Sequence, residues 1–101
     1  MDDNRIVMRY HPMQSPERIG KRLRMTRIAL GYDGKQAEFA AEIAVLPTAL
    51  SQWELAYQGR TITIGAAIRL CDRFGLDLDW IYRGDPSGLP QRLNSLAQRV
   101  G

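Results

Sequence analysis

Residues 36–57 read QAEFAAEIAVLPTALSQWELAY, and this pattern predicts two short helices that meet at a corner. In the first helix, Phe39 and Ile43 are four residues apart and share one face. In the second helix, large side chains recur with helical spacing and form one inward stripe: Leu50, Trp53, Glu54 and Tyr57. Pro47 cannot continue the first helix but suits the first turn of the next, so we expect the second helix over about residues 47–57.

The other side of the second helix carries a small polar surface. Thr48 and Gln52 lie roughly opposite the inward stripe when residues are placed at about 100° intervals. A short helix, a sharp corner and a second helix with a polar outer edge form the arrangement that places a helix in the major groove of DNA. Gln52 can contact adenine N6 and N7, and Thr48 can offer its hydroxyl or pack its methyl group on thymine. Such a polar pair is also common on a helix face that is merely solvated.

An ordered set of residues between Ile19 and Gly84 resembles the Cro and phage-repressor family, which carries an XRE-type, lambda-repressor-like helix-turn-helix. The matching residues are Ile19 to Arg24, Arg27, Leu30, Gly31, Gln36, Phe39, Ala40, Val45, Leu50 to Glu54, and Leu78 to Gly84. The resemblance implies an all-α fold, namely a five-helix domain that contains the helix-turn-helix and is followed by a C-terminal amphipathic helix. The chain departs from the family at Ala44 and Ala56, where glycine is usual, and at Leu46, where a small capping residue is usual.

The resemblance also implies which residues contact DNA. It puts Thr48 and Gln52 at positions that reach base edges. It gives Gln36 a phosphate contact at the start of its helix, where free N–H groups favour an anion; the alternative is a solvated side chain. The full set of residues expected at the DNA backbone is Lys35, Gln36, Ala49, Ser51 and Arg60.

A buried ion pair is expected behind the polar surface. Glu54 lies beside the inward stripe and should be partly buried, and a buried carboxylate needs a partner. The resemblance places Arg27 there, and a bidentate arginine is the best partner for a carboxylate. We therefore expect the Arg27–Glu54 pair to be structural and not catalytic.

The composition is that of one globular domain. Of the 101 residues 45% are hydrophobic and 25% charged. No apolar run approaches the roughly 20 residues of a membrane span. The start, MDDNRIVMRYHP, lacks the long apolar core of a secretory signal, and one cysteine, Cys71, cannot form an internal disulfide. We therefore expect a cytoplasmic protein, of the bacterial or phage-regulator type that the resemblance implies.

The net charge of +3 is unevenly distributed. Residues 1–35 carry a balance of +4 and residues 58–101 one of +2, whereas residues 36–57 contain three glutamates and no lysine or arginine. Attraction to phosphate must therefore come from outside the two-helix unit. The cations of the preceding helix are expected to point outward, either as phosphate contacts or as a solvated face: Arg18, Lys21, Arg22 and Arg24.

The predicted organisation has three parts: a flexible arm over 1–14, the helix-turn-helix domain over 15–84, and a turn with a C-terminal helix over 85–101. Further helices are predicted after capping side chains and before glycines, over about 16–30, 64–74 and 78–83. The expected inward residues of the second of these are Ile64, Ala67, Ile68, Cys71 and Phe74, and those of the third are Leu78, Trp80 and Ile81. The C-terminal stripe, which either folds back on its own domain or forms a dimer, is Leu89, Leu93, Leu96 and Val100.

These features favour sequence-specific binding to double-stranded DNA by a small transcriptional regulator, with repression and a homodimer expected. The alternative is a protein-interaction module or antitoxin-like partner with a weakened DNA face. Leu46, Leu55, Ala56 and the acidic two-helix unit favour this alternative. An enzyme is not expected, because the one histidine is His11 and no catalytic or metal-ligand spacing is present. We accordingly predict no catalytic residue, metal, cofactor, small-molecule ligand or membrane contact.

Overall fold

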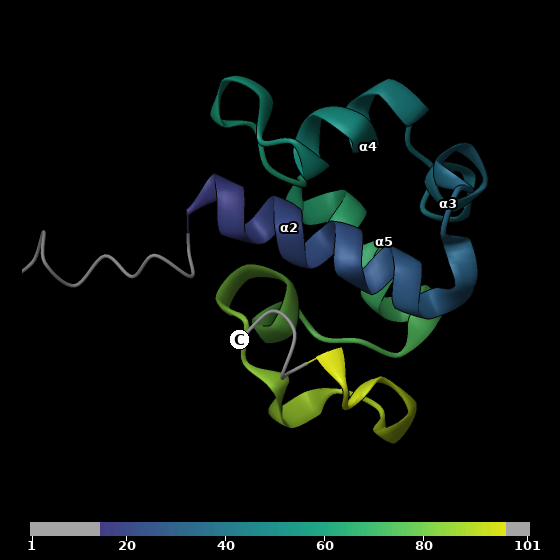
Figure 1. Cartoon of the computed structure of the whole chain (residues 1–101), viewed down its shortest axis with the longest axis vertical. Helices are drawn as coiled ribbons and strands as arrows, with labels where there is room; N and C mark the ends of the chain where they lie inside the picture. The colour runs from purple at the N-terminus through teal and green to yellow at the C-terminus, as the bar shows by residue number, and fades with distance from the viewer. Residues whose placement is uncertain (1–14, 97–101) are drawn as a thin grey trace, which may run out of the picture.

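The computed structural model describes residues 15–96, and within that range the fold is all-α, without a β-strand (Figure 1). The predicted arm over 1–14 lies outside the described residues, as do residues 97–101 with Val100. In the part of the chain that is described, every helix is too short or too polar to cross a membrane.

Helix α2 (Pro16–Arg27) runs through the middle of the molecule (Figure 1). The predicted cap is confirmed, because the Ser15 hydroxyl oxygen accepts a hydrogen bond from the backbone N–H of Arg18 at 3.2 Å. Regular α-helical geometry ends at Arg27, before the predicted residue 30, and a π-helical turn η2 (Ile28–Tyr32) follows. Gly31 in this turn has a φ of +97°, which glycine adopts without steric cost.

Helices α3 (Gln36–Glu42) and α4 (Pro47–Glu54) meet at the predicted corner. Ala44 in the corner has a φ of +58°, a left-handed conformation that favours glycine. The prediction that the second helix extends over 47–57 is wrong at its end. Ala56 is left-handed and turns the chain away after Glu54, so Tyr57 leaves the inward stripe and is half-exposed.

Helix α5 (Ile64–Phe74) begins after the predicted cap, Thr63, and ends at Gly75. Its predicted buried face is confirmed at Ala67 and Cys71 but wrong at Ile64 and Ile68, which are 58% and 44% exposed. The residues that α5 buries are Ala66, Ala67, Leu70 and Cys71. The fully buried alanines are small enough for α5 to lie close to the core, which leaves the larger isoleucines at its rim.

The segment after α5 contains short helical turns: η4 (Asp79–Arg83), η5 (Pro86–Gly88) and η6 (Gln91–Leu93). The Asp77 carboxylate accepts from the N–H of Trp80 at 2.9 Å, so it caps η4 as predicted, but Leu78 is exposed and not inward. The predicted continuous C-terminal helix is absent from residues 85–95. The chain there forms two short 3-10 helices, η5 and η6, joined by extended residues and followed by a turn. The apolar side chains of this segment are buried within the chain's own core: Leu89, Leu93 and Leu96. Of the two alternatives for this stripe, packing against its own domain is the one that Leu89, Leu93 and Leu96 show.

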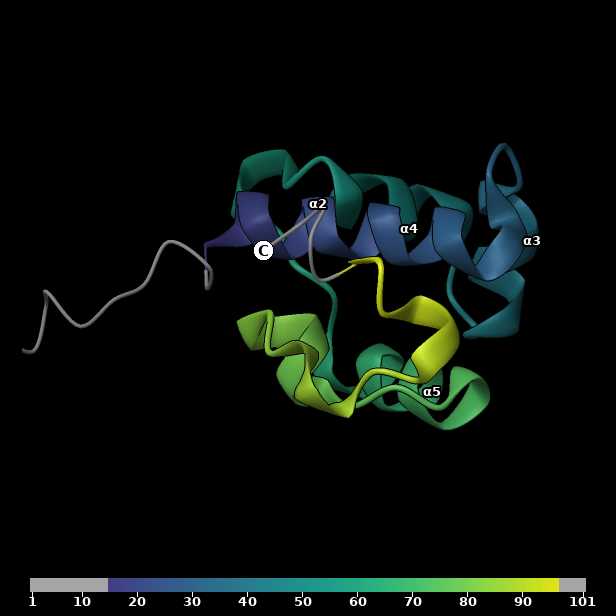
Figure 2. The same ribbon diagram turned by 60° about the horizontal axis from the view of Figure 1, so that its bottom comes forward.

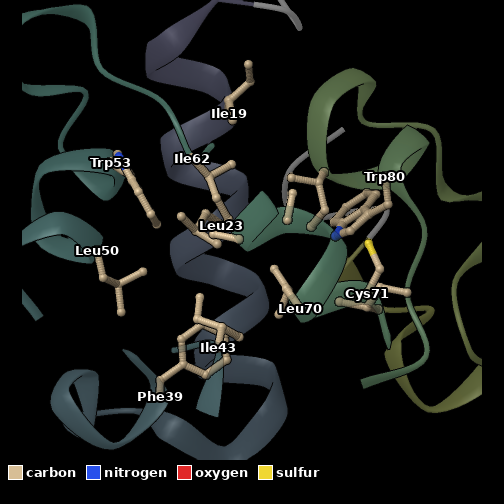
Figure 3. Close-up of a cluster of buried hydrophobic side chains, with 14 of the residues drawn as sticks. Ile19, Leu23, Phe39, Ile43, Leu50, Trp53, Ile62, Leu70, Cys71 and Trp80 are labelled. Carbon is tan, nitrogen blue, oxygen red and sulfur yellow. The ribbon is translucent and has the colours of Figure 1, made fainter. Parts of the chain in front are cut away.

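One hydrophobic cluster contains buried side chains from α2, α3, α4, α5, η4 and the C-terminal segment (Figure 3). Leu23 of α2 lies at its centre in the close-up, between Leu50 of α4 and Leu70 of α5. Phe39 of α3 stacks on Phe74 of α5 with ring centroids 5.7 Å apart. In Figure 2, α2 and α4 form one layer, and α5 with the C-terminal turns forms the other. The two-helix corner is therefore mounted on both α2 and α5.

A buried polar network fastens the other side of α2 to η4. The prediction that Arg22 points outward is wrong, because this residue is only 2% exposed. Its guanidinium donates to the carbonyl oxygens of Trp80 at 2.9 Å and Ile81 at 3.0 Å, and burial, together with the charge of Arg18, lowers its pKa. The Thr26 hydroxyl accepts from the Trp80 indole N–H at 3.0 Å. Arg22 thus binds two carbonyl groups of η4 from within the protein.

Candidate functional site

Helix α4 lies directly against the backbone of α2 at Gly20. A Cβ atom at Gly20 would lie 2.8 Å from the carbonyl oxygen of Glu54 and would collide with that of Trp53. The two helices can approach this closely only because Gly20 has no side chain. At this contact one face of α4 is packed against α2, and the opposite face, which carries Thr48, is exposed to solvent.

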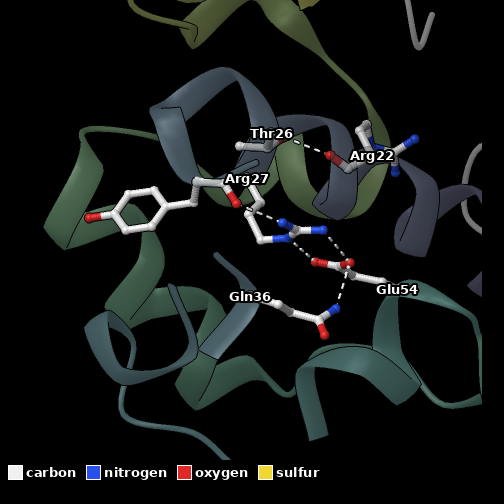
Figure 4. A network of polar contacts seen from close by, with 6 residues as sticks. Arg22, Thr26, Arg27, Gln36 and Glu54 are labelled. Carbon is white, nitrogen blue, oxygen red and sulfur yellow. Dashed lines mark hydrogen bonds and ion pairs between the residues drawn. The ribbon is translucent and has the colours of Figure 1, made fainter. Parts of the chain in front are cut away.

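The expected ion pair lies at this contact (Figure 4). Arg27 Nε is 2.8 Å from Glu54 Oε2, and its Nη2 donates to Glu54 Oε1 at 3.1 Å. The two side chains are 7% and 3% exposed. Arg27 Nη1 also donates to the carbonyl oxygen of Tyr32 at 2.7 Å. The arginine therefore joins the end of α2, the turn after it and the end of α4.

Gln36 belongs to the same network, a role that the sequence interpretation missed. Its amide nitrogen donates to Glu54 Oε1 at 3.0 Å (Figure 4). A buried carboxylate can accept about four hydrogen bonds, so the Arg27 guanidinium alone leaves acceptor sites that another donor can fill. The need of a buried Glu54 for a donor besides Arg27 was the signal in the sequence that could have pointed to Gln36. Gln36 consequently couples the start of α3 to the end of α4.

A polar pocket of about 410 Å³ opens above this network. Its lining comes from α2, α3, α4 and the turn between the first two, and consists of Arg24, Arg27, Asp33, Gly34, Gln36, Ser51, Glu54 and Leu55. Gln36 and Ser51, both predicted to contact a DNA backbone, meet here, together with the exposed Arg24. Two other predicted backbone residues, Lys35 and Ala49, do not line the pocket; Lys35 is exposed and Ala49 partly exposed.

The outer face of α4 is polar and uncharged. Thr48 is exposed, while Ser51 and Gln52 are partly exposed. The side chains on the opposite face are buried: Leu50, Trp53 and Glu54. The face is therefore available to a partner, and its hydroxyl and amide groups can form directional hydrogen bonds.

Arg60 and Gln52, predicted as separate contacts, are joined. Arg60 Nη1 donates to Gln52 Oε1 at 2.8 Å, and the guanidinium lies over the Tyr57 ring, 5.8 Å from its centroid. The loop after α4 brings them together, because Ala56 and Gln58 both adopt a φ of +53° and fold the chain back. The glycine that is usual in the family at the position of Ala56 was a signal for the first of these two conformations. Nothing in the sequence indicated the second, at Gln58, so the pair was not predicted.

Arginines from outside the two-helix unit offset its acidic charge. Besides the Arg27–Glu54 pair, Arg73 of α5 forms an ion pair with Glu42 at 2.8 Å. Arg69 of α5 donates to the carbonyl oxygen of Ile43 at 2.8 Å and so satisfies the end of α3. Two of the three glutamates that make residues 36–57 acidic thus have arginine partners. The negative balance counted along the sequence overstates the charge that this region presents.

Exposed leucines mark both ends of α4. Leu46 is 70% exposed just before the helix, and Leu55 is 75% exposed just after it. Leu46 occupies the N-cap position and, having no polar side chain, forms no capping hydrogen bond. Apolar groups beside a polar face can contact a protein partner or the methyl group of thymine.

The single cysteine offers no reactive thiolate at neutral pH. Burial, and then the charges of Asp77 and Asp72, raise the pKa of Cys71 to about 11. Among the described residues, no group of three or more histidine, cysteine, aspartate or glutamate side chains could hold a metal ion.

The chain was compared with models of protein families, with curated proteins and with solved structures, and none of these matches it.

Proposed function

We propose that the chain is a small sequence-specific DNA-binding regulator of the Cro-like, lambda-repressor-like type, in which α4 enters the major groove. The observation that carries this proposal is the division of α4 into a buried side and an exposed side. The buried side is anchored by Gly20 and the Arg27–Glu54 pair, while the exposed side presents Thr48 and Gln52. A rigidly mounted helix with polar groups on its outer face can meet base edges at a defined angle.

The pocket beside α4 supports a phosphate contact in this proposal. Arg24 at its edge supplies a positive charge, and Ser51 supplies a hydroxyl donor. The Gln36 amide has a second N–H group besides the one that it donates to Glu54. In this arrangement Arg24, Gln36 and Ser51 bind the DNA backbone, with Lys35 and the backbone near Ala49 beside them.

A second candidate function is binding to a protein, as in an antitoxin-like partner. The high exposure of Leu46 and Leu55 at the two ends of α4 favours it. The replacement of both leucines by serine separates the two functions. It should abolish binding to a protein partner, whereas the salt-dependent part of DNA binding should persist.

The test is to measure the affinity of the full chain for selected and random duplexes at two salt concentrations. A DNA-binding protein loses affinity with a slope of about −0.9 per phosphate neutralised, and Arg24→Ala should reduce that slope by about 1. Arg83→Ala is the matched control, because Arg83 belongs to η4, on the other side of α2 from α4 (Figure 1), and it should leave the slope unchanged. A dimer should prefer half-sites about 34–36 Å apart. The absence of binding to every duplex at low salt would reject the proposal.

A further inference from the structure

We infer that Gln52 and Arg60 form one unit, rich in N–H donors and positively charged, that selects guanine over adenine, an inference that rests on the proposed function. The two side chains lie at the outer end of α4 and are joined by a 2.8 Å hydrogen bond from Arg60 Nη1 to Gln52 Oε1. Tyr57 supports the guanidinium from one side, and Gln58 accepts a longer bond of 3.4 Å from Arg60 Nη2.

The chemistry of arginine determines which end of the glutamine amide faces outward. A guanidinium has five N–H groups and no acceptor, so the atom of Gln52 that faces Arg60 must be the oxygen. The amide nitrogen of Gln52 is therefore free for a ligand. The pair presents mainly N–H donors, namely those of the Gln52 amide nitrogen and those that Arg60 does not use for Gln52 and Gln58, beside one remaining lone pair on the Gln52 oxygen.

The bases of DNA differ in how well they suit such a unit. Guanine presents two acceptors in the major groove, N7 and O6, whereas adenine presents one acceptor and the N6 amino group. The contact with adenine that the sequence suggested needs the Gln52 oxygen to accept from N6. Arg60 uses one of the two lone pairs of that oxygen and places its own N–H donors and positive charge beside it, where they oppose the N6 amino group of adenine and favour the O6 acceptor of guanine. Cytosine presents an amino donor and is also disfavoured. The pair therefore matches guanine, with the Arg60 charge adding strength to the bond.

The experiment begins with duplexes selected from a random pool by the full chain. The base pair read by Gln52 is the one at which Gln52→Ala loses discrimination. At that position, guanine replaced by adenine or by 7-deazaguanine should weaken binding by about tenfold. Hypoxanthine keeps N7 and O6 and lacks only the minor-groove amino group of guanine, so it should bind within about twofold of guanine.

Substitution of Arg60 separates positioning from simple phosphate binding. Arg60→Ala removes the cationic donor group that opposes the adenine amino group, so adenine should bind as well as guanine and the ratio of their dissociation constants should fall to about one. Gln52→Glu should shift the preference towards cytosine, because a carboxylate only accepts. Arg83→Ala is again the control and should keep the preference for guanine. Both variant positions lie on the surface, and circular dichroism verifies that the helices remain folded.

Two different failures can be told apart. If Arg60→Ala weakens all duplexes by one factor and keeps the guanine preference, Arg60 is a phosphate contact and the inference is wrong, while DNA binding stands. If the unmodified chain binds no duplex at low salt, the proposed function fails, and the inference fails with it.

Discussion

The two sides of α4 differ in how strongly their surroundings constrain them. On the buried side, Gly20 brings two backbones into contact and Glu54 is held by Arg27 and Gln36. On the exposed side, Thr48 faces solvent and the Gln52 oxygen is bound by a single side chain from a neighbouring loop. Substitutions on the buried side should therefore change stability, whereas those on the exposed side should change what is bound.

The largest effect is expected at the ion pair. Arg27→Ala leaves the Glu54 carboxylate buried without its main partner, so the free energy of unfolding should fall by about 3–5 kcal/mol, measured by urea denaturation. The double variant Arg27→Met with Glu54→Leu removes both charges and should recover much of that loss. A loss of less than about 1 kcal/mol in the single variant would show that the pair does not anchor α4.

Next in size is the backbone contact at Gly20. Gly20→Ala forces α2 and α4 apart and should lower the free energy of unfolding by roughly 1–3 kcal/mol. Gly65→Ala is a matched control in α5, since its Cβ would meet only the Arg69 side chain at 3.6 Å. That variant should gain about 0.5–1 kcal/mol, because alanine suits a helix better than glycine. Equal effects at both positions would contradict a tight contact between α2 and α4.

On the exposed side the expected pattern reverses. Thr48→Ala should leave the free energy of unfolding within about 0.5 kcal/mol, yet weaken binding to the selected duplex by about 1 kcal/mol, measured by titration of labelled DNA. The opposite control is Thr63→Ala, which removes the cap of α5 and should cost about 1 kcal/mol of stability without changing base preference. If Thr48→Ala destabilised the fold instead, the proposed separation of the two sides would be wrong.

The smallest effect is expected in the corner that sets the angle of α4. Ala44 has a φ of +58°, a conformation that costs an L-residue about 1–2 kcal/mol. Glycine removes this cost but has more freedom in the unfolded chain, so Ala44→Gly should raise stability by about 0.5 kcal/mol. Ala41→Gly in the regular part of α3 should lower it by about 0.5–1 kcal/mol. Thermal unfolding measures both variants. A rise of the unfolding temperature in Ala44→Gly and a fall in Ala41→Gly would support strain in the corner, whereas a change of the same sign in both would contradict it.

The helix positions were largely predictable because their signals are local. Ser15, Thr63 and Asp77 each accept a backbone N–H three residues ahead, so a short window of sequence was enough to place three helix starts. The ends were less predictable. Residues 47–57 show helical periodicity throughout, but the left-handed Ala56 stops α4 at Glu54.

The sequence by itself determined the helical class and the corner at Pro47, because caps and periodicity operate between neighbours. Its periodicity also showed that Glu54 needs a buried partner, whereas Arg27 as that partner was implied by the family resemblance. Tertiary packing alone decided that Arg22 turns inward to carbonyl groups 58 and 59 residues away, that α5 buries alanines and exposes isoleucines, and that Arg60 returns to Gln52. The physical reason is that an apolar stripe identifies a helix but not its exact rotation, which depends on how closely the partner elements approach. The candidate site lies where these two kinds of information meet: α4 was visible in the sequence, and the partner of its outer amide was not.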